Sequence, residues 1–172
     1  MGLKTDVRRN LTALTGTWEL WQRSQSLPKP IGTRLFSAAV ALKAPYFRTV
    51  LPHVRELGPG RCVVTAPKWW GVQNHIGTFH AIAACNLAEV AMGMLAEATV
   101  PPTHRWIPKA MTALYLAKTQ GGLTATAQLD PRPDFALITS GVDVVVPVSL
   151  VDAAGVESVH CDITIWVTPR KR

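Results

Sequence analysis

The chain has 172 residues, of which 48% are hydrophobic and 17% are charged. That length fits one domain with a sizeable core, and the composition excludes a disordered chain. Because so little charge is available to cover a monomer's surface, we expect some apolar surface to be buried between subunits. The three cysteines, Cys62, Cys85 and Cys161, lie far apart without zinc-ligand spacing. We therefore expect reduced thiols, no bound metal and a cytoplasmic location.

The formal net charge of +7 is confined to the first third of the chain. Residues 1–61 hold ten Lys and Arg against three Asp and Glu, and the remaining residues hold eight of each kind. The basic residues are spread over predicted helices and a strand, without the interleaved aromatics of a nucleic-acid-binding face. We therefore expect no nucleic-acid partner and only a weak attraction for anionic ligands.

The first 45 residues are predicted to form a helical extension. Apolar residues from Val7 to Trp21 recur every three or four positions, and a second short helix is predicted over residues 31–44. We interpret the first helix as docking on the domain or on a partner subunit. A membrane-surface helix is the alternative, because its basic and tryptophan residues partly suit that role. Residues 46–172 are predicted to be the main domain.

The main domain is predicted to contain two strands, a long helix and four more strands. These elements occupy residues 50–57, 61–67, 78–99 (the helix), 105–116, 123–129, 140–151 and 156–168. Pro108 predicts an edge strand or a bulge at its position. In the last strand every second residue from Val159 to Val167 faces one way, which indicates one buried face.

Small apolar residues lie on every side of the predicted long helix, which indicates a buried helix. His80, Asn86, Glu89 and Glu97 would be costly in hydrocarbon, so we expect no membrane span. A six-stranded antiparallel sheet wrapped around the helix is the arrangement that buries it. This is an α+β architecture.

The segment from Asn74 to Glu89 is the candidate site. A glycine-containing loop runs into a helix N-terminus, where unpaired N–H groups and the helix dipole favour negative charge. Asn74 supplies an amide beside that end, and Glu89 places one carboxylate in an apolar helix. Acyl transfer needs donors for a carbonyl oxygen and a base or nucleophile near the carbonyl carbon, and this segment offers both.

The pattern N-x5-H-x8-E, here Asn74, His80 and Glu89, resembles the hot-dog-fold thioesterases of the phenylacetate-pathway and 4-hydroxybenzoyl-CoA type. Together with the order of elements, the resemblance covers roughly residues 50–168. It implies hydrolysis of acyl-CoA or acyl-carrier thioesters without a cofactor, coenzyme A being part of the substrate. It also implies a homodimer or a dimer of dimers.

The resemblance assigns a role to each matching residue. Asn74 would orient the thioester, the backbone N–H of Ala81 would polarise its carbonyl, and Glu89 would act as nucleophile or as general base for water. His80 completes the catalytic motif, and we interpret its side chain as a hydrogen-bonding group at the helix N-terminus rather than an acid or base. The predicted substrate-binding residues are His75, Gly77, Thr78, Trp69 and Trp70.

His80 and Glu89 are nine residues apart, which at about 100° per residue places them on opposite faces of the helix. One helix cannot turn both toward the same pocket. The spacing therefore fits the arrangement that the resemblance implies, in which one subunit supplies the helix end and the other supplies the carboxylate.

Several alternatives stay open. Glu89 could be a structural residue paired with a buried Arg or His. Trp69 and Trp70 could be interface anchors rather than the wall of an acyl tunnel, and His75 could simply be exposed. Relatives often carry Gly-Gly where this chain has Ala81-Ile82, which supports a non-catalytic protein that binds an acyl chain or acyl-CoA. A dehydratase is weaker, because the hydratase signature is absent.

Overall fold

The computed structural model describes residues 16–170 of the chain. Two helices come first, α2 (Thr17–Ser24) and α3 (Lys29–Lys43), followed by the 3₁₀ segment η1 (Pro45–Val50). The main domain then contains β1 (His53–Gly58), β2 (Arg61–Ala66), η2 (Trp70–Val72), α4 (Ala81–Thr99), β3 (His104–Tyr115), β4 (Leu123–Gln128), η3 (Phe135–Leu137), β5 (Val142–Asp152) and β6 (Glu157–Pro169). The predicted order of strands and helices is confirmed.

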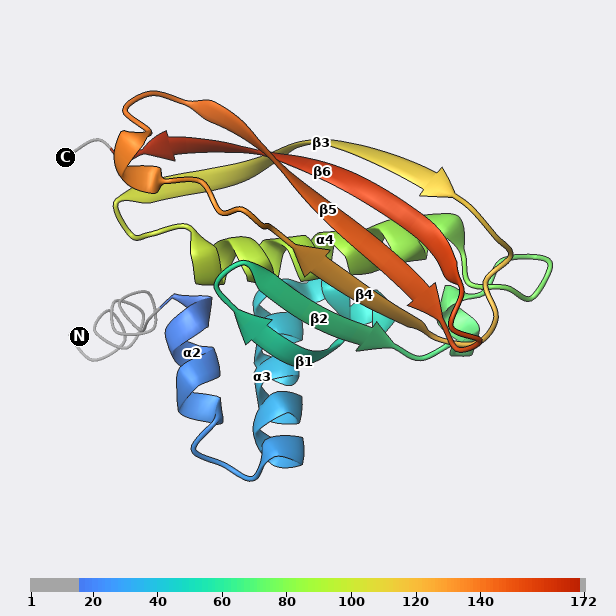
Figure 1. The fold of residues 1–172 in the computed structure, drawn as a ribbon. Helices are drawn as coiled ribbons and strands as arrows, with labels where there is room; N and C mark the ends of the chain where they lie inside the picture. Colours follow the sequence, from blue (N-terminus) through green and yellow to red (C-terminus); the bar gives the residue numbers. More distant parts are fainter. Residues whose placement is uncertain (1–15, 171–172) are drawn as a thin grey trace, which may run out of the picture.

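The six strands form one antiparallel sheet in the order β1-β2-β4-β5-β6-β3. The sheet curves around α4, as Figure 1 shows. The edge strand β3 pairs with β6 along its whole length, with a register shift between Pro108 and Ala110. Pro108 thus lies on an edge strand and beside a bulge, where the missing N–H is tolerated. The α+β fold expected from the sequence is confirmed.

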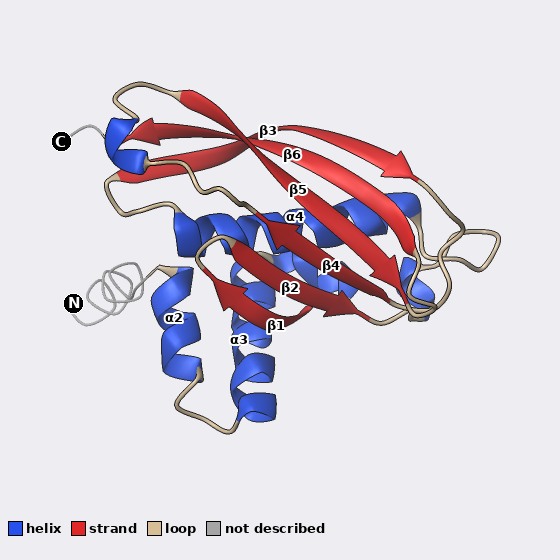
Figure 2. Ribbon diagram, viewed as in Figure 1, coloured by secondary structure: helices blue, strands red, loops and turns tan. Residues whose placement is uncertain are grey.

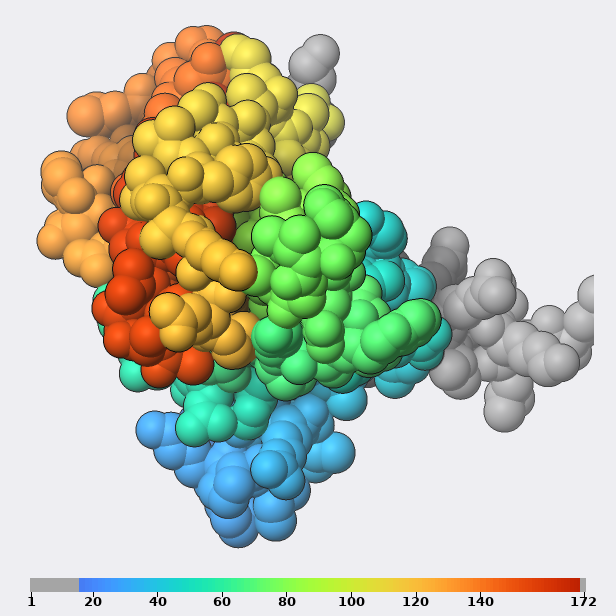
Figure 3. Space-filling model, turned by 90° about the vertical axis from the view of Figure 1, so that its right-hand side faces the viewer, coloured from blue at the N-terminus to red at the C-terminus, as the bar shows by residue number. Residues whose placement is uncertain are grey.

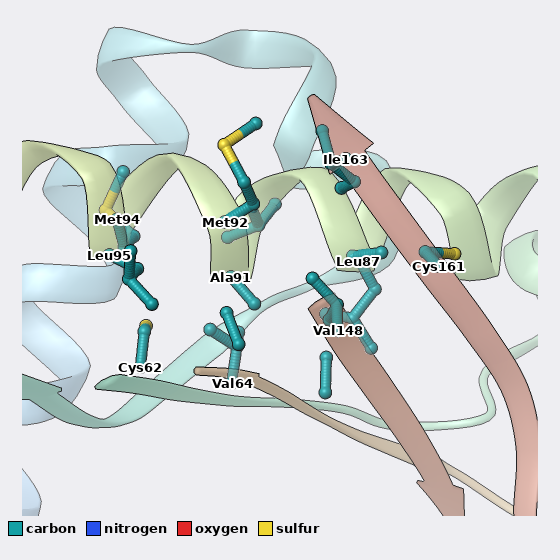
Figure 4. Packing of buried hydrophobic residues seen from close by; sticks show 14 of the residues in the cluster. Cys62, Val64, Leu87, Ala91, Met92, Met94, Leu95, Val148, Cys161 and Ile163 are labelled. Carbon is teal, nitrogen blue, oxygen red and sulfur yellow. The ribbon is translucent and has the colours of Figure 1, made fainter. Parts of the chain in front are cut away.

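The core lies between α4 and the concave face of the sheet. Leu87, Ala91 and Leu95 are fully buried and point toward strand residues such as Val64 and Val148 (Figure 4). The predicted alternation in β6 is confirmed, since every second residue from Val159 to Val167 is buried. α4 is long and apolar enough to cross a membrane, but 61% of its apolar window is buried in the fold. This burial is typical of the core helix of a folded domain.

The helices α2 and α3 form a hairpin outside the sheet (Figure 2). Trp21 of α2 and Phe36 of α3 are buried edge to face, with ring centroids 5.0 Å apart. α2 also packs on α4, and α3 packs on β1. The described part of the first predicted helix therefore docks on its own domain, and residues 7–15 lie outside the described residues. The division of the chain at residue 45 stays a prediction.

Two helix ends differ from the sequence prediction. The first helix ends at Ser24 rather than near Pro28, because the backbone turns there and the N–H of Leu27 donates to the carbonyl of Ser24 at 3.2 Å. The long helix begins at Ala81 rather than Thr78, because His80 caps it and Thr78 belongs to the preceding loop.

Candidate active site

The loop before α4 is held in shape by Asn74. Its Oδ1 accepts hydrogen bonds from the N–H groups of Ile76 at 3.1 Å and Thr78 at 3.0 Å, and its Nδ2 donates to the Thr78 hydroxyl at 2.7 Å. Gly77 allows the turn by adopting a φ of +73°. An amide nitrogen carries two hydrogens, so this loop uses one of them. The second Nδ2 hydrogen is the one that Asn74 could offer to a ligand.

His80 caps the N-terminus of α4. Its Nδ1 accepts a hydrogen bond from the N–H of Ile82 at 3.1 Å, and its backbone N–H donates to the carbonyl of Val72 at 2.7 Å. An accepting Nδ1 leaves the proton of a neutral imidazole on Nε2. The N–H of Ala81, the first residue of the helix, meets no acceptor within residues 16–170. It is therefore a free donor at the positive end of a 19-residue helix.

Glu89 lies half-buried in the middle of α4. Within residues 16–170 its carboxylate has neither a hydrogen-bond partner nor a basic nitrogen within 4.0 Å. The structural alternative, in which Glu89 pairs with a buried Arg or His, therefore finds no support in the described part of the chain. Glu89 instead contributes to the wall of a cavity.

This cavity has a volume of about 600 Å³ and lies between the α2–α3 hairpin, α4 and β3. Its wall is mainly apolar, and Leu20, Val40, Phe47, Met92 and Trp106 contribute to it. In Figure 4 Met92 points to the side of α4 opposite Leu87, Ala91 and Leu95, toward the pale blue N-terminal helices. The cavity thus lies on the side of α4 that faces the α2–α3 hairpin.

The free donor of Ala81 and the carboxylate of Glu89 are not brought together within one chain. The two residues are eight positions apart in the α-helix, which corresponds to about 12 Å along the axis. A single thioester carbonyl needs both groups within about 3 Å. One copy of the chain therefore holds two halves of the predicted site, at two different places.

Exposed apolar side chains line the edge that could receive a second copy. On β3, Ile107 is 60% exposed and Leu114 and Tyr115 are each 53% exposed, and Ile82 in the first turn of α4 is 57% exposed. Figure 3 faces the end of the molecule where the loop and first turn of α4 (green) lie beside the segment that follows β3 (yellow to gold). The start of α4 and the free edge of the sheet are therefore neighbours on the surface.

The other predicted site residues lie on the loop rather than in the cavity. Trp70 is 84% exposed, whereas the indole N–H of Trp69 donates to the carbonyl of Thr49 at 3.2 Å. The His75 side chain is exposed, and Thr78 is buried by its contact with Asn74. The cavity wall comes from α2, α3, η1, α4 and β3, so neither tryptophan contributes to it.

Sequence reasoning gave no role to Asn86, which is buried in α4. Its Nδ2 donates to the Thr49 hydroxyl at 3.0 Å and lies 3.4 Å from the carbonyl of Tyr46, so it fastens η1 to the helix. Its Oδ1 is buried without a partner within residues 16–170. The signal in the sequence is a second polar residue, close to Glu89, in an otherwise apolar helix.

Two of the cysteines, Cys62 and Cys161, are poor nucleophiles in this environment. Burial raises the pKa of Cys161 to about 12 and holds the pKa of Cys62 even further above its usual range. The hydrogen bond between Tyr115 and Cys85, followed by burial, raises the pKa of Tyr115 to about 12, and the sulfur and the phenol oxygen are 3.3 Å apart. Within the described residues, no three His, Cys, Asp or Glu side chains are grouped to hold a metal ion.

Comparison with known proteins places the chain in a family. A family model described as a domain of unknown function, DUF4442, matches residues 32–167. The chain belongs to this family. No curated protein matches it. The family segment takes in most of α3 and nearly all of the sheet, so it includes the motif and the part of the cavity wall that lies outside α2.

Solved structures show the same fold. A crystal structure from a structural-genomics programme is 38% identical, with a TM-score of 0.76 over 90% of this chain and 99% of that one. A probable thioesterase from Pseudomonas aeruginosa is 22% identical, with a TM-score of 0.71 over 84% and 97%. A thioesterase from Staphylococcus aureus is 17% identical, with a TM-score of 0.62 over 72% and 98%. This DUF4442 chain therefore has the hot-dog fold, and the fold that the resemblance implies is confirmed.

Proposed function

We propose that the protein hydrolyses acyl-CoA thioesters at a site shared by two subunits. The observation that carries the proposal is Glu89, a half-buried carboxylate without a partner among residues 16–170, lining an apolar cavity in a thioesterase-type fold. A charge kept in such surroundings without a partner costs stability, and such groups are typical of functional sites. The reaction needs no metal or redox cofactor, and an acyl-carrier thioester would serve the same chemistry.

The catalytic steps follow from the two half-sites. The thioester carbonyl oxygen accepts a hydrogen bond from the Ala81 N–H at the positive end of α4, which stabilises the developing oxyanion. Glu89 of the partner subunit takes a proton from water while the water oxygen bonds to the carbonyl carbon. The C–S bond then breaks, and the proton passes to the sulfur. Direct attack by the carboxylate, followed by hydrolysis of the anhydride, gives the same acid and thiol.

The loop residues have supporting roles in this proposal. Asn74 uses its remaining amide hydrogen to orient the thioester, and His80 fixes the first turn of the helix so that the Ala81 N–H keeps its direction. His75, Gly77 and Thr78 would form the substrate loop. Trp69 and Trp70 would pack against the ligand or the partner subunit, because large exposed aromatics are typical of interfaces.

A pair of subunits joined through β3 would bring the half-sites together. β3 is a 12-residue edge strand, and such an edge offers unpaired N–H and C=O groups to a second strand. Pairing of β3 with its own copy would bury the exposed apolar residues of this edge on both subunits, since a twofold interface uses the same patch twice. We propose a homodimer of this kind, alone or within a dimer of dimers.

The alternative function is binding without turnover. Ile82 is 57% exposed beside the Ala81 N–H, at a position where the thioesterases that the motif resembles often have glycine. Its side chain narrows the approach of a thioester to the helix end. In that case the same cavity would hold an acyl chain or acyl-CoA, and Glu89 would contribute to affinity instead of chemistry.

The decisive test is release of free thiol from a panel of short, long and aromatic acyl-CoAs. The substitution Glu89→Gln keeps the shape of the side chain and removes the base, so we expect turnover to fall by about 100-fold or more. Ligand binding, measured by calorimetry with a slowly hydrolysed thioether analogue, should persist. Glu56→Gln removes an exposed carboxylate on β1 and serves as the matched control. Equal rates in the wild type and Glu89→Gln would rule out the Glu89 mechanism, and no hydrolysis of any thioester would favour the binding protein.

A further inference from the structure

We infer that the cavity between the α2–α3 hairpin and α4 holds an aliphatic acyl chain, and that α3 sets the longest chain accepted. This inference rests on the proposed function, because it takes Glu89 as the chemical end of the cavity. It adds a substrate class and a specificity-determining wall, both built from the N-terminal helices.

The chemistry of the wall fits a flexible hydrocarbon. The volume of about 600 Å³ lies within the range of pockets that enclose whole small molecules. Met92 and Met94 contribute unbranched, adaptable side chains, which adjust to ligands of variable shape. Leu20, Val40 and Phe47 add apolar surface from the hairpin and η1. Burial of each methylene in such a wall contributes about 0.8 kcal/mol.

The cavity follows α4 over the residues from Glu89 to Glu97. Glu89 and Glu97 both contribute to its wall, and the eight residue steps from one to the other correspond to about 12 Å of helix axis. Gly93 lies between them, and the Trp106 ring packs over this glycine, 3.6 Å from where a Cβ would stand. A chain anchored by its thioester near Glu89 could therefore extend along α4 under the hairpin. A single aromatic ring would fill only part of this length.

Two adjacent alanines of α3 lie on different sides of the helix, one at the cavity and one at the outer surface. Ala39 is half-buried and contributes to the cavity, whereas Ala38 is exposed and faces an open groove on the other side of the helix. A larger side chain at Ala39 would project into the space that we assign to the acyl chain. The same side chain at Ala38 would project away from it. The pair therefore provides a substitution and its matched control.

The test compares the wild type, Ala39→Phe and Ala38→Phe in two assays. The first measures kcat/KM for saturated acyl-CoAs of rising length and for phenylacetyl-CoA. We expect the wild type to prefer aliphatic chains over the aromatic one. For the longest chains, Ala39→Phe should lower kcat/KM about tenfold or more, because each misfitting methylene changes selectivity by about 10-fold or more. For the shortest chains, kcat/KM should stay at the wild-type value. Ala38→Phe should reproduce the wild-type profile.

The second assay does not depend on turnover and measures binding of a fluorescent long-chain fatty acid. We expect Ala39→Phe to weaken binding about tenfold and Ala38→Phe to leave it unchanged, with circular dichroism showing both variants folded. If binding follows this pattern but neither the wild type nor any variant hydrolyses a thioester, the proposed reaction is wrong and the assignment of the acyl pocket still holds. A wild-type preference for the aromatic thioester, or identical length profiles and affinities in all three proteins, would overturn the pocket.

Discussion

Two polar residues three positions apart on α4 have different surroundings. Asn86 is buried and hydrogen-bonded to Thr49 of η1, whereas Glu89 lines the cavity with no partner among residues 16–170. The sequence alone identifies both as exceptions in an apolar helix and singles out Glu89 through its spacing from Asn74. The sequence cannot distinguish a residue that holds η1 in place from a carboxylate that is open to a ligand. The difference depends on which side chains of η1 and α3 pack beside each position.

Asp152, at the end of β5, gives a pH-dependent prediction at the residue scale. Its carboxylate accepts hydrogen bonds from the N–H groups of Gln120 at 2.8 Å, Ala154 at 2.9 Å and Val156 at 3.1 Å. These bonds, that of Gln120 foremost, hold the pKa of Asp152 below its ordinary value of 3.8. A lowered folded-state pKa stabilises the fold above the unfolded-state pKa, and this contribution is lost as the pH falls through the folded-state value.

We therefore expect Asp152→Asn to lower the free energy of unfolding at pH 7, with a difference from the wild type that shrinks below about pH 4. Urea unfolding at a series of pH values between 2 and 7 measures this difference. Asp162→Asn removes a more exposed carboxylate from the neighbouring strand β6 and provides the control. A difference from the wild type that stays constant over the whole range would contradict this account of Asp152.

At the scale of the elements, local pattern predicts the strands better than the helix ends. Alternation in β6 indicates which of its residues are buried, and Pro108 indicates that β3 lies at the edge, because these features depend on period and hydrogen bonding. The end of α2 and the start of α4 depend instead on one turn and one capping side chain. The cavity could not be predicted at all, since its wall requires the packing of α2 and α3 against α4.

The packing within the hairpin depends on Gly32. A Cβ at this position would stand 2.1 Å from the carbonyl oxygen of Ser24, and a backbone atom cannot move aside as a flexible side chain does. Gly32→Ala should therefore destabilise the protein by about 1–3 kcal/mol, although alanine is the better helix former. Gly93→Ala is the control, because its Cβ would make only ordinary contact with Trp106 and should stabilise the helix. Thermal unfolding measures both, and equal melting temperatures for the two variants would contradict the close-packing explanation.

At the scale of the whole molecule, the 12 Å between the half-sites means that the proposed reaction requires two subunits. Ala81 is the first residue of α4, where proline is well tolerated, and His80 has an extended backbone that suits the position before proline. Ala81→Pro thus removes the N–H that would polarise the carbonyl while the helix persists. We expect this variant, like Glu89→Gln, to be inactive as a pure protein.

Mixing the two inactive variants should restore activity. After subunits exchange at equal concentrations, half of the dimers contain one chain of each kind, and each such dimer holds one complete site. Activity should therefore return to about a quarter of the wild-type value. A steady-state thiol-release assay before and after exchange, with either variant alone as the control, measures this. No recovery in mixed dimers that are shown to form would rule out the shared site.

The hairpin and the reactive groups come from separate stretches of the chain. Residues 17–44 provide one wall of the cavity, whereas Asn74, Ala81 and Glu89 lie on the motif loop and on α4. If that cavity holds the acyl group, substitutions in the hairpin can change the preferred substrate while the catalytic machinery stays intact. This separation would make substrate range an independently evolvable trait, and it marks the hairpin as the segment to randomise when the protein is to be redirected to a new thioester.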